Sequence, residues 1–354
     1  MKIITKYLLT KYIKYFFIIL LSLELFFVGI DLLQYFTRLP DSANLQLLYV
    51  MYNVFFTLTI TLPLSLVFAW IVTLTFLIKD NALVSFYALG ISQKKILMPI
   101  ILISTLFTLI LIALQSTPLA YAYEEKNKIL ENRYFVNEQN NIFLKYNEYF
   151  VYFKKLYPIE KKAIDIHIFK TKGNDIVETI VGKKAFYQNN KWYVIDTKIT
   201  KKPTTIDWNS SKLDVSYEKF LYTLEGFEPK IISNVYKGKA QYSVIDAIRA
   251  IVLLDIQEFN TNKIKSILYS QIVMPFFVLP LIVLIFIYTT PSSRFFNSAI
   301  FISAMIFLSL SVWGILFLLQ KLALGSILLA EIAIIVPVVL FFIIAYILYS
   351  KKSI

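Results

Sequence analysis

Six long apolar runs constrain this sequence more than any other feature. They fall at about 14–35, 53–78, 95–118, 266–290, 296–320 and 327–350. At 1.5 Å of rise per residue, each run is long enough to cross a hydrocarbon layer of ~30 Å. The composition agrees, since only 17% of the residues are charged, against about a quarter in an average soluble protein. The sequence therefore predicts a polytopic α-helical membrane protein with six transmembrane helices.

The charges that flank these runs predict the orientation of the chain. Six spans place both termini on one side of the membrane. The short segments on that side share an excess of basic residues: Lys2, Lys6, Lys11, Lys14, Lys79, Lys94, Lys95, Arg294, Lys351 and Lys352. The short segments opposite hold little beyond Arg38 and Lys321. By the positive-inside rule, both termini are expected in the cytoplasm.

The first helix is expected to remain as an anchor, because lysines precede it and no small-residue cleavage site follows it. The net charge of +13 is compatible with anionic lipid headgroups, with topology signals or with a genome that favours lysine. Five prolines lie within the spans: Pro63, Pro99, Pro275, Pro280 and Pro337. They predict kinked, packed helices, with a gating hinge as the alternative.

The region between the third and fourth runs has the pattern of strands. Hydrophobic residues alternate in 149–153, 164–168 and 192–196, and Asn189-Asn190 predicts a hairpin turn. Several short strands separated by turns indicate an antiparallel sandwich or jelly roll. We therefore divide the chain into spans 1–3 (1–118), a jelly-roll-like β domain outside the cytoplasm (119–262) and spans 4–6 (263–354).

The residue types present exclude several kinds of chemistry. The chain has no cysteine, and its single histidine, His167, lies in a predicted strand without partners at metal-ligand spacing. The glycines are isolated and form no phosphate-binding loop. No paired carboxylates or nucleophile motif accompany the spans. We therefore expect no metal site, no cofactor, no catalytic residues and no nucleic-acid partner, and any ATP hydrolysis must belong to another chain.

The connection between the second and third runs is a candidate functional segment. Leu83, Phe86, Tyr87 and Gly90 fall on one face of a predicted short helix at about 80–90. Asp80 or Asn81 can cap its start, and Gly90 is a natural C-terminal stop. Such a helix is either a passive connector or a docking element for a cytoplasmic partner.

This segment resembles a known family. The run Ala88-Leu89-Gly90-Ile91-Ser92, followed by Lys94-Lys95, is similar to the coupling-helix signature of the LptF/LptG lipopolysaccharide-export permeases. The order of three spans, an insertion of roughly 140 residues and three more spans, with Arg294 between the fourth and fifth, also resembles that family along essentially the whole chain. The stretch 30–34 and the outer domain favour LptG over LptF.

The resemblance implies a permease subunit of an ATP-driven lipopolysaccharide extractor in the bacterial inner membrane. Its expected partners are a dimeric LptB-like cytoplasmic ATPase, a second related permease chain, and an LptC-like periplasmic bridge that receives the lipopolysaccharide on its way to the outer membrane. It implies an ATPase-coupling set of Asp80, Ala82, Leu83, Phe86, Tyr87, Gly90 and Ser92. Family members usually carry an acid eight positions before the glycine, where this chain has Ala82. Asp80 can substitute for it, but from another helical face.

The first span supplies the candidate lipid-binding residues, Glu24, Asp31, Gln34 and Arg38. Glu24 lies within the span, where an ionisable side chain is either functional or packed as a polar group inside the bundle. The resemblance implies that Arg38, at the outer end, meets lipid phosphates, with a snorkelling anchor as the alternative. A non-transporting membrane scaffold or signalling protein with an outer binding domain remains the alternative function.

Overall fold

The computed structural model describes residues 2–132, 139–158, 160–172, 175–203, 212–229, 241–255 and 261–352. The chain divides into two compact units. The helical unit comprises Met1–Asn132, Gln241–Ile251 and Asn260–Ile354, and the sheet unit comprises Arg133–Ala240 and Val252–Phe259. The division at residues 119 and 262 expected from the spans stays a prediction.

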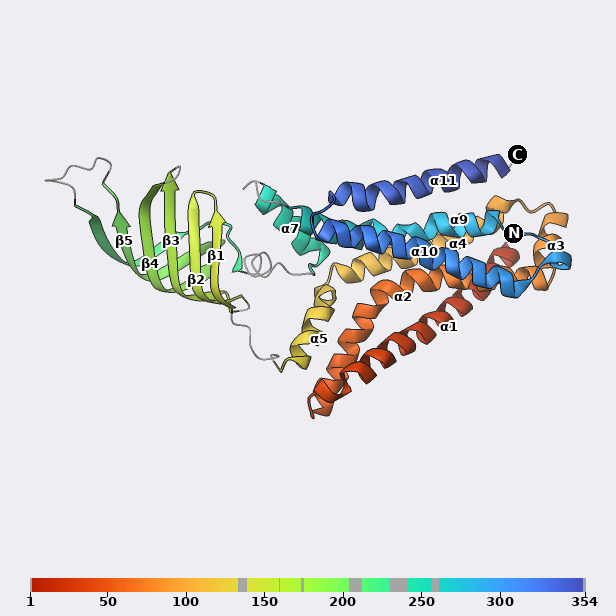
Figure 1. Cartoon of the computed structure of the whole chain (residues 1–354), viewed down its shortest axis with the longest axis horizontal. Helices are drawn as coiled ribbons and strands as arrows, with labels where there is room; N and C mark the ends of the chain where they lie inside the picture. The colour runs from red at the N-terminus through yellow and green to blue at the C-terminus, as the bar shows by residue number, and fades with distance from the viewer. Residues whose placement is uncertain are drawn as a thin grey trace. The chain divides into compact units, whose positions relative to one another are not determined.

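Helices make up nearly all of the described helical unit, and Figure 1 shows both chain termini and α3 at the same end of its bundle. In chain order the helices are α1 (Lys2–Tyr35), η1 (Phe36–Arg38), α2 (Ala43–Lys79), α3 (Ala82–Ala88), α4 (Gln93–Gln115), η2 (Pro118–Tyr121), α5 (Ala122–Leu130), α7 (Val244–Asp255), α8 (Asn262–Ile272), η3 (Met274–Phe277), α9 (Val278–Ile287), η4 (Ser293–Phe295), α10 (Ser298–Leu324), the π-helix η5 (Glu331–Ile335) and α11 (Val336–Lys352).

Five of the described helices are long and apolar enough to cross a membrane. They are Ile3–Arg38, Ala43–Lys79, Gln93–Gln115, Ser298–Leu324 and Glu331–Lys351. The remaining predicted span is a pair of helices, Asn262–Ile272 and Met274–Ile287, bent by 44°. Pro275 follows the break, and proline cannot donate the helical hydrogen bond and clashes with the preceding turn. If the bent pair is one span, the bundle has the predicted six.

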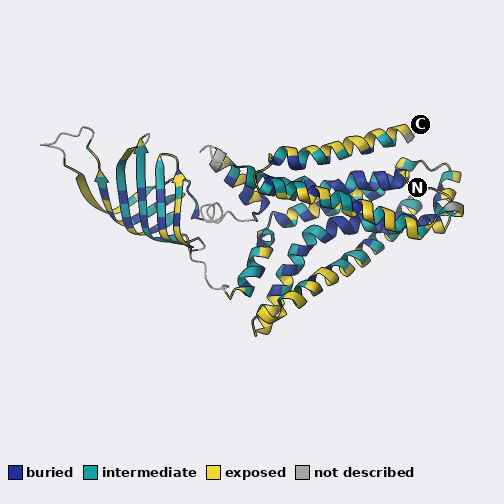
Figure 2. Ribbon diagram, viewed as in Figure 1, coloured by how far each residue is buried: buried dark blue, intermediate teal, exposed yellow. Residues whose placement is uncertain are grey.

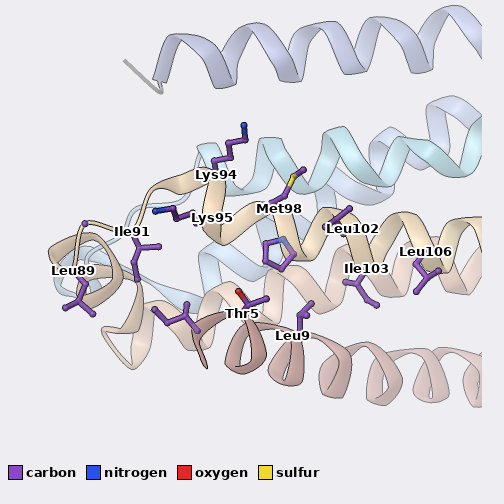
Figure 3. A pocket seen from close by; sticks show the side chains of 13 residues that line it. Thr5, Leu9, Leu89, Ile91, Lys94, Lys95, Met98, Leu102, Ile103 and Leu106 are labelled. Atoms are coloured by element: carbon purple, nitrogen blue, oxygen red, sulfur yellow. The ribbon is translucent and has the colours of Figure 1, made fainter. Parts of the chain in front are cut away.

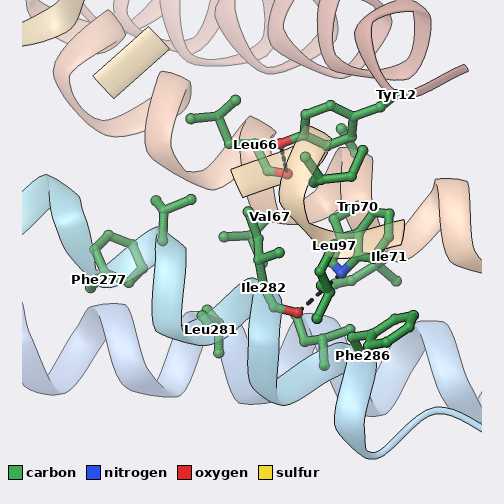
Figure 4. Packing of buried hydrophobic residues seen from close by; sticks show 14 of the residues in the cluster. Tyr12, Leu66, Val67, Trp70, Ile71, Leu97, Phe277, Leu281, Ile282 and Phe286 are labelled. Carbon is green, nitrogen blue, oxygen red and sulfur yellow. Dashed lines mark hydrogen bonds between the residues drawn. The ribbon is translucent and has the colours of Figure 1, made fainter. Parts of the chain in front are cut away.

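The core of the bundle is held together by buried aromatic side chains that also satisfy polar atoms (Figure 4). Trp70 of α2 is fully buried, and its indole N–H donates a hydrogen bond of 3.1 Å to the carbonyl oxygen of Ile282 in α9. Tyr12 of α1 donates to the carbonyl oxygen of Leu66 at 2.9 Å, and its hydroxyl lies 2.8 Å from that of Ser104 in α4. These contacts connect α1, α2, α4 and α9 around one core.

The sheet unit contains six described strands in one antiparallel sheet (Figure 1). They are β1 (Gln139–Tyr146), β2 (Tyr149–Tyr157), β3 (Lys162–Lys172), β4 (Asp175–Gln188), β5 (Lys191–Lys201) and β6 (Asp214–Thr223). Each strand pairs with the next along the chain, which is the connection of a meander. The three predicted strands lie in β2, β3 and β5, so the expected polytopic helical fold with an inserted antiparallel β domain is confirmed. The sandwich or jelly-roll arrangement of that domain stays a prediction, because the described strands form a single meander sheet.

The hairpin turn between β4 and β5 is the one predicted at Asn189-Asn190. Both asparagines have positive φ, 47° and 64°, and the flanking Gln188 and Lys191 are paired. This conformation is typical of a tight two-residue turn, and asparagine tolerates it better than most residues do.

One face of the sheet carries a hydrophobic core, as the alternation of buried and exposed positions along the strands shows (Figure 2). Trp192 of β5 is fully buried there, in ring contact with Phe153 of β2 at 5.2 Å between centroids. The segment after β6 returns to this core: Phe227 stacks on Tyr146 at 4.3 Å, and its carbonyl oxygen accepts a hydrogen bond of 2.7 Å from the Trp192 indole. The turn after β6 therefore packs against both β1 and β5.

Candidate functional sites in the helical unit

The predicted coupling segment forms the seven-residue helix α3, bounded by two residues in the left-handed conformation. Asn81 precedes it with φ of 55°, and Gly90 follows it with φ of 72°. The Gly90 amide donates to the carbonyl oxygen of Tyr87 at 2.9 Å, and the Ile91 amide donates to that of Phe86 at 3.0 Å. This pair of bonds is a Schellman motif, which confirms Gly90 as the stop of the helix.

Replacing Gly90 with alanine is expected to fray the end of α3. A Cβ at this position meets no atom within 4 Å, so the cost comes from the backbone conformation alone, and for alanine it is about 1 kcal/mol. Gly90→Asn is the matched control, because asparagine tolerates the same conformation. Amide hydrogen exchange over residues 86–91 of the full-length protein should accelerate in Gly90→Ala and remain close to wild type in Gly90→Asn. Equal exchange in both variants would contradict the assignment.

The two sides of α3 have different surroundings. Leu83 and Phe86 are buried in the core of the bundle, and Tyr87 packs against that core. Val84 in α3 and Leu89, its C-cap residue, are exposed, with fractions of 41% and 73%. The predicted hydrophobic face therefore anchors the helix to its own chain, and the surface available to a partner is the part that carries Val84 and Leu89.

Polar contacts connect this segment to two other parts of the bundle. The carboxylate of Asp80 pairs with Lys11 of α1 at 2.9 Å. The side-chain oxygen of Asn81 accepts a hydrogen bond of 2.6 Å from Ser293, in the connection between α9 and α10. The sequence suggested that Asp80 or Asn81 caps α3. Neither side chain does so in the structure, because both are engaged in these contacts. Ala82 begins α3, and Ser92 precedes α4.

The four candidate lipid-binding residues separate into two pairs with different environments. Glu24 and Asp31 are seven positions apart and face the bundle. Glu24 is buried, and its carboxylate accepts hydrogen bonds from Thr57, at 2.7 Å, and from Thr61, both in α2. The carboxylate of Asp31 accepts a hydrogen bond from Tyr49. Polar packing inside the bundle thus accounts for the position of Glu24.

Asp31 also has a cationic partner that the sequence did not indicate. Lys126 of α5, whose side chain is only 3% exposed, pairs with the Asp31 carboxylate at 2.7 Å and donates to the side-chain oxygen of Asn53 at 3.0 Å. The rings of four aromatic residues surround the ammonium group at 5.5–5.8 Å: Tyr35, Tyr49, Phe56 and Tyr123. We call Lys126, its two polar partners and these rings the Lys126 cluster. It joins α5 to α1 and α2.

Gln34 and Arg38 lie on the exposed side of the same helical end. Ile30 and Leu33 beside them are 48% and 79% exposed, so the two polar side chains border an apolar surface. Arg38 has no ion-pair partner among the residues that the structure describes. The arrangement leaves its guanidinium group available to an anion, for which bidentate hydrogen bonding suits it.

His167 lies in β3, where its ring nitrogen is 3.2 Å from the Asp165 carboxylate. Burial opposes ionisation of Asp165, but Lys154 and His167 outweigh it and lower the pKa of that carboxyl group. Within the described ranges no group of three metal-ligating side chains occurs. The surroundings of His167 are those of a half-exposed strand residue in contact with a neighbouring carboxylate.

These features define an integral membrane protein whose bundle of five or six spanning helices carries an inserted antiparallel sheet unit and a short anchored helix between the second and third spans. The family model described as lipopolysaccharide export system permease LptF/LptG matches residues 6–351. The chain therefore belongs to the LptF/LptG family, and it is a permease component of the lipopolysaccharide export system rather than an ATPase. No curated protein matches it. The assignment to LptG rather than LptF stays a prediction.

Proposed function

We propose that this chain is the membrane subunit of an ATP-driven extractor that takes lipopolysaccharide from the inner membrane and passes it to a periplasmic bridge. The observation that supports this most directly is α3, a helix fixed to its own bundle while leaving Val84 and Leu89 exposed. A helix with this arrangement can fit a groove on an ATPase and transmit the movement of that ATPase to the spans.

Contacts around α3 provide a route for that movement. The Asp80–Lys11 pair and the edge contact between Tyr7 and Phe86, with 6.4 Å between ring centroids, connect the segment to α1. The bond from Ser293 to Asn81 connects it to the start of the fifth span. We infer that α3, held by Leu83 and Phe86, moves these two spans together, and that the lipid enters sideways between the first and fifth spans of paired permease chains.

At the outer end of α1, Arg38 and Gln34 are the proposed contacts for lipid phosphate and sugar groups. Asp31 and Glu24 support them from inside the bundle, where Lys126, Thr57 and other partners already engage their carboxylates. The proposed orientation places the termini and α3 in the cytoplasm and the sheet unit in the periplasm, because lysine is concentrated at the end that bears the termini. Exposed apolar side chains of the sheet unit, such as Tyr217 and Phe220 of β6, then offer a surface for acyl chains. Such chains lose ~0.8 kcal/mol per CH₂ on exposure to water.

Co-purification from the native host tests this proposal. Full-length protein should retain a second permease chain and an ATPase whose turnover rises with added lipopolysaccharide. Val84→Glu with Leu89→Glu should abolish retention of the ATPase, because two carboxylates would be buried in an apolar contact. Lys351→Glu, also a charge change at the end that bears the termini, is the control and should retain it. A stable partner without ATPase activity would overturn the proposal.

A further inference from the structure

A groove of about 800 Å³ lies between the start of α1 and the first half of α4, beside the end of the coupling segment (Figure 3). Leu9 contributes from α1, Leu89 and Ile91 contribute from the α3–α4 connection, and α4 contributes a stripe of residues at helical spacing. In that stripe Met98, Leu102 and Leu106 are 46%, 60% and 51% exposed. The groove is therefore apolar and open along its length.

The groove has a cationic end. Lys94 and Lys95 line it where α4 begins, and both are exposed. In the part of the chain that the structure describes, neither has an ion-pair partner. Both lysines lie in the first turn of α4, where the helix dipole disfavours cations. No acidic residue in that turn offsets their charges. An anion bound beside these two unpaired lysines would therefore be stabilised by their charges.

The position of the groove in the membrane limits what can fill it. Gln93–Gln115 is a spanning helix, so Lys94 and Lys95 lie at the boundary between water and hydrocarbon. From Met98 to Leu106 the helix advances ~12 Å, which is within the thickness of one leaflet. The occupant must therefore combine an anionic group at the boundary with an apolar chain that runs into the leaflet. That combination is the chemistry of an anionic phospholipid.

We propose that this groove binds an anionic phospholipid from the leaflet on the side of the chain termini, with the phosphate between Lys94 and Lys95 and an acyl chain along Met98, Leu102 and Leu106. The site is separate from the proposed cargo contacts, because Arg38 lies roughly 50 Å further along α1 than Thr5, which also lines the groove. The bound lipid contacts Ile91, which follows the Gly90 stop of α3. Binding of the lipid in the groove therefore affects how firmly α3 is held against the bundle.

Native mass spectrometry of the full-length protein in detergent tests the site directly. Phosphatidylglycerol should bind more tightly than phosphatidylcholine, by about fivefold for each lysine that meets the headgroup and so roughly 25-fold for both. Lys94→Gln with Lys95→Gln should remove this preference. The matched control is Lys79→Gln with Lys351→Gln, which removes the same charge from two other exposed lysines and should keep it.

A second variant tests the apolar part. Leu102→Trp fills the groove and should lower the affinity for phosphatidylglycerol while both lysines remain. Inorganic phosphate alone should neither bind measurably nor displace the lipid. Equal binding of the two lipids by the wild type, an equal loss in the Lys79/Lys351 control, or undiminished binding by a folded Leu102→Trp protein would each overturn the proposal. None of these outcomes depends on lipopolysaccharide transport.

Discussion

Replacing Lys126 with methionine is expected to detach α5 from the first two spans and to destabilise the helical unit by about 3–5 kcal/mol. Methionine retains most of the apolar stem, so the change in stability measures the contribution of the ammonium group. The change leaves the Asp31 carboxylate, 21% exposed, without its cation and leaves the Asn53 oxygen without its donor. Thermal unfolding of the full-length protein and hydrogen exchange over residues 122–130 should both report the change.

Two further variants separate the ion pair from general effects on α5. Lys128→Met changes the same residue type on the same helix. Among the residues that the structure describes, Lys128 pairs only with Glu124 and Glu125 within α5, and it is 25% exposed, so the expected loss is at most about 0.5 kcal/mol. Adding Asp31→Asn to Lys126→Met should recover part of the stability, because asparagine keeps an acceptor for Tyr49 and removes the isolated charge. If Lys126→Met and Lys128→Met unfold alike, the Lys126 cluster does not hold α5.

The Lys126 cluster also marks a limit of what the sequence could predict. Asp31 and Lys126 are 95 positions apart, and no periodicity or motif links them. One signal was available: an aspartate near the end of an apolar run needs a partner, because an unpaired charge is costly beside lipid. The sequence indicated that such a partner had to exist but offered many lysines from which to choose. Only the placement of α5 against α1 and α2 identifies Lys126.

The segment that forms α3 was predictable in its bounds, but the surroundings of its hydrophobic face were not. Local chemistry determines where α3 ends, because Gly90 accepts a positive φ that most residues resist. The spacing of Leu83 and Phe86 correctly indicated a hydrophobic face, but two surfaces compete for such a face: the chain's own bundle and a partner. The structure shows that this hydrophobic face packs against the chain's own bundle. Periodicity alone does not distinguish these cases.

The sheet provides a similar contrast. Alternating residues predicted its strands, and the paired asparagines predicted a hairpin, since both are local patterns. Gly182, in contrast, is only an isolated glycine in the sequence. In the structure it lies opposite β5, where an added Cβ would clash with a methyl carbon of Val194. That requirement depends on the register of β4 with β5, which alternation in each strand does not specify.

Replacing Trp192 with alanine is expected to have the largest effect in the sheet unit, about 3–5 kcal/mol. Its side chain is fully buried, touches Phe153 and Tyr187, and donates to the Phe227 carbonyl oxygen. The loss therefore combines a large cavity with an unsatisfied buried acceptor. Hydrogen exchange of the β5 amides in the full-length protein, measured against denaturant, gives the change in opening free energy.

A graded pair of variants distinguishes the ring from its hydrogen bond. Trp192→Phe keeps most of the aromatic volume and loses the indole donor, so it should cost less than Trp192→Ala by the energy of the cavity. Tyr217→Thr, at a β6 position that is 76% exposed, keeps a strand-forming residue and should remain within about 0.5 kcal/mol of wild type. In Trp192→Ala the loss of the Phe227 contact should also speed exchange in the turn after β6. Unchanged exchange there would mean that Trp192 does not hold that turn against β1 and β5, and that the core of the sheet is closed by Tyr146 and Phe227 alone.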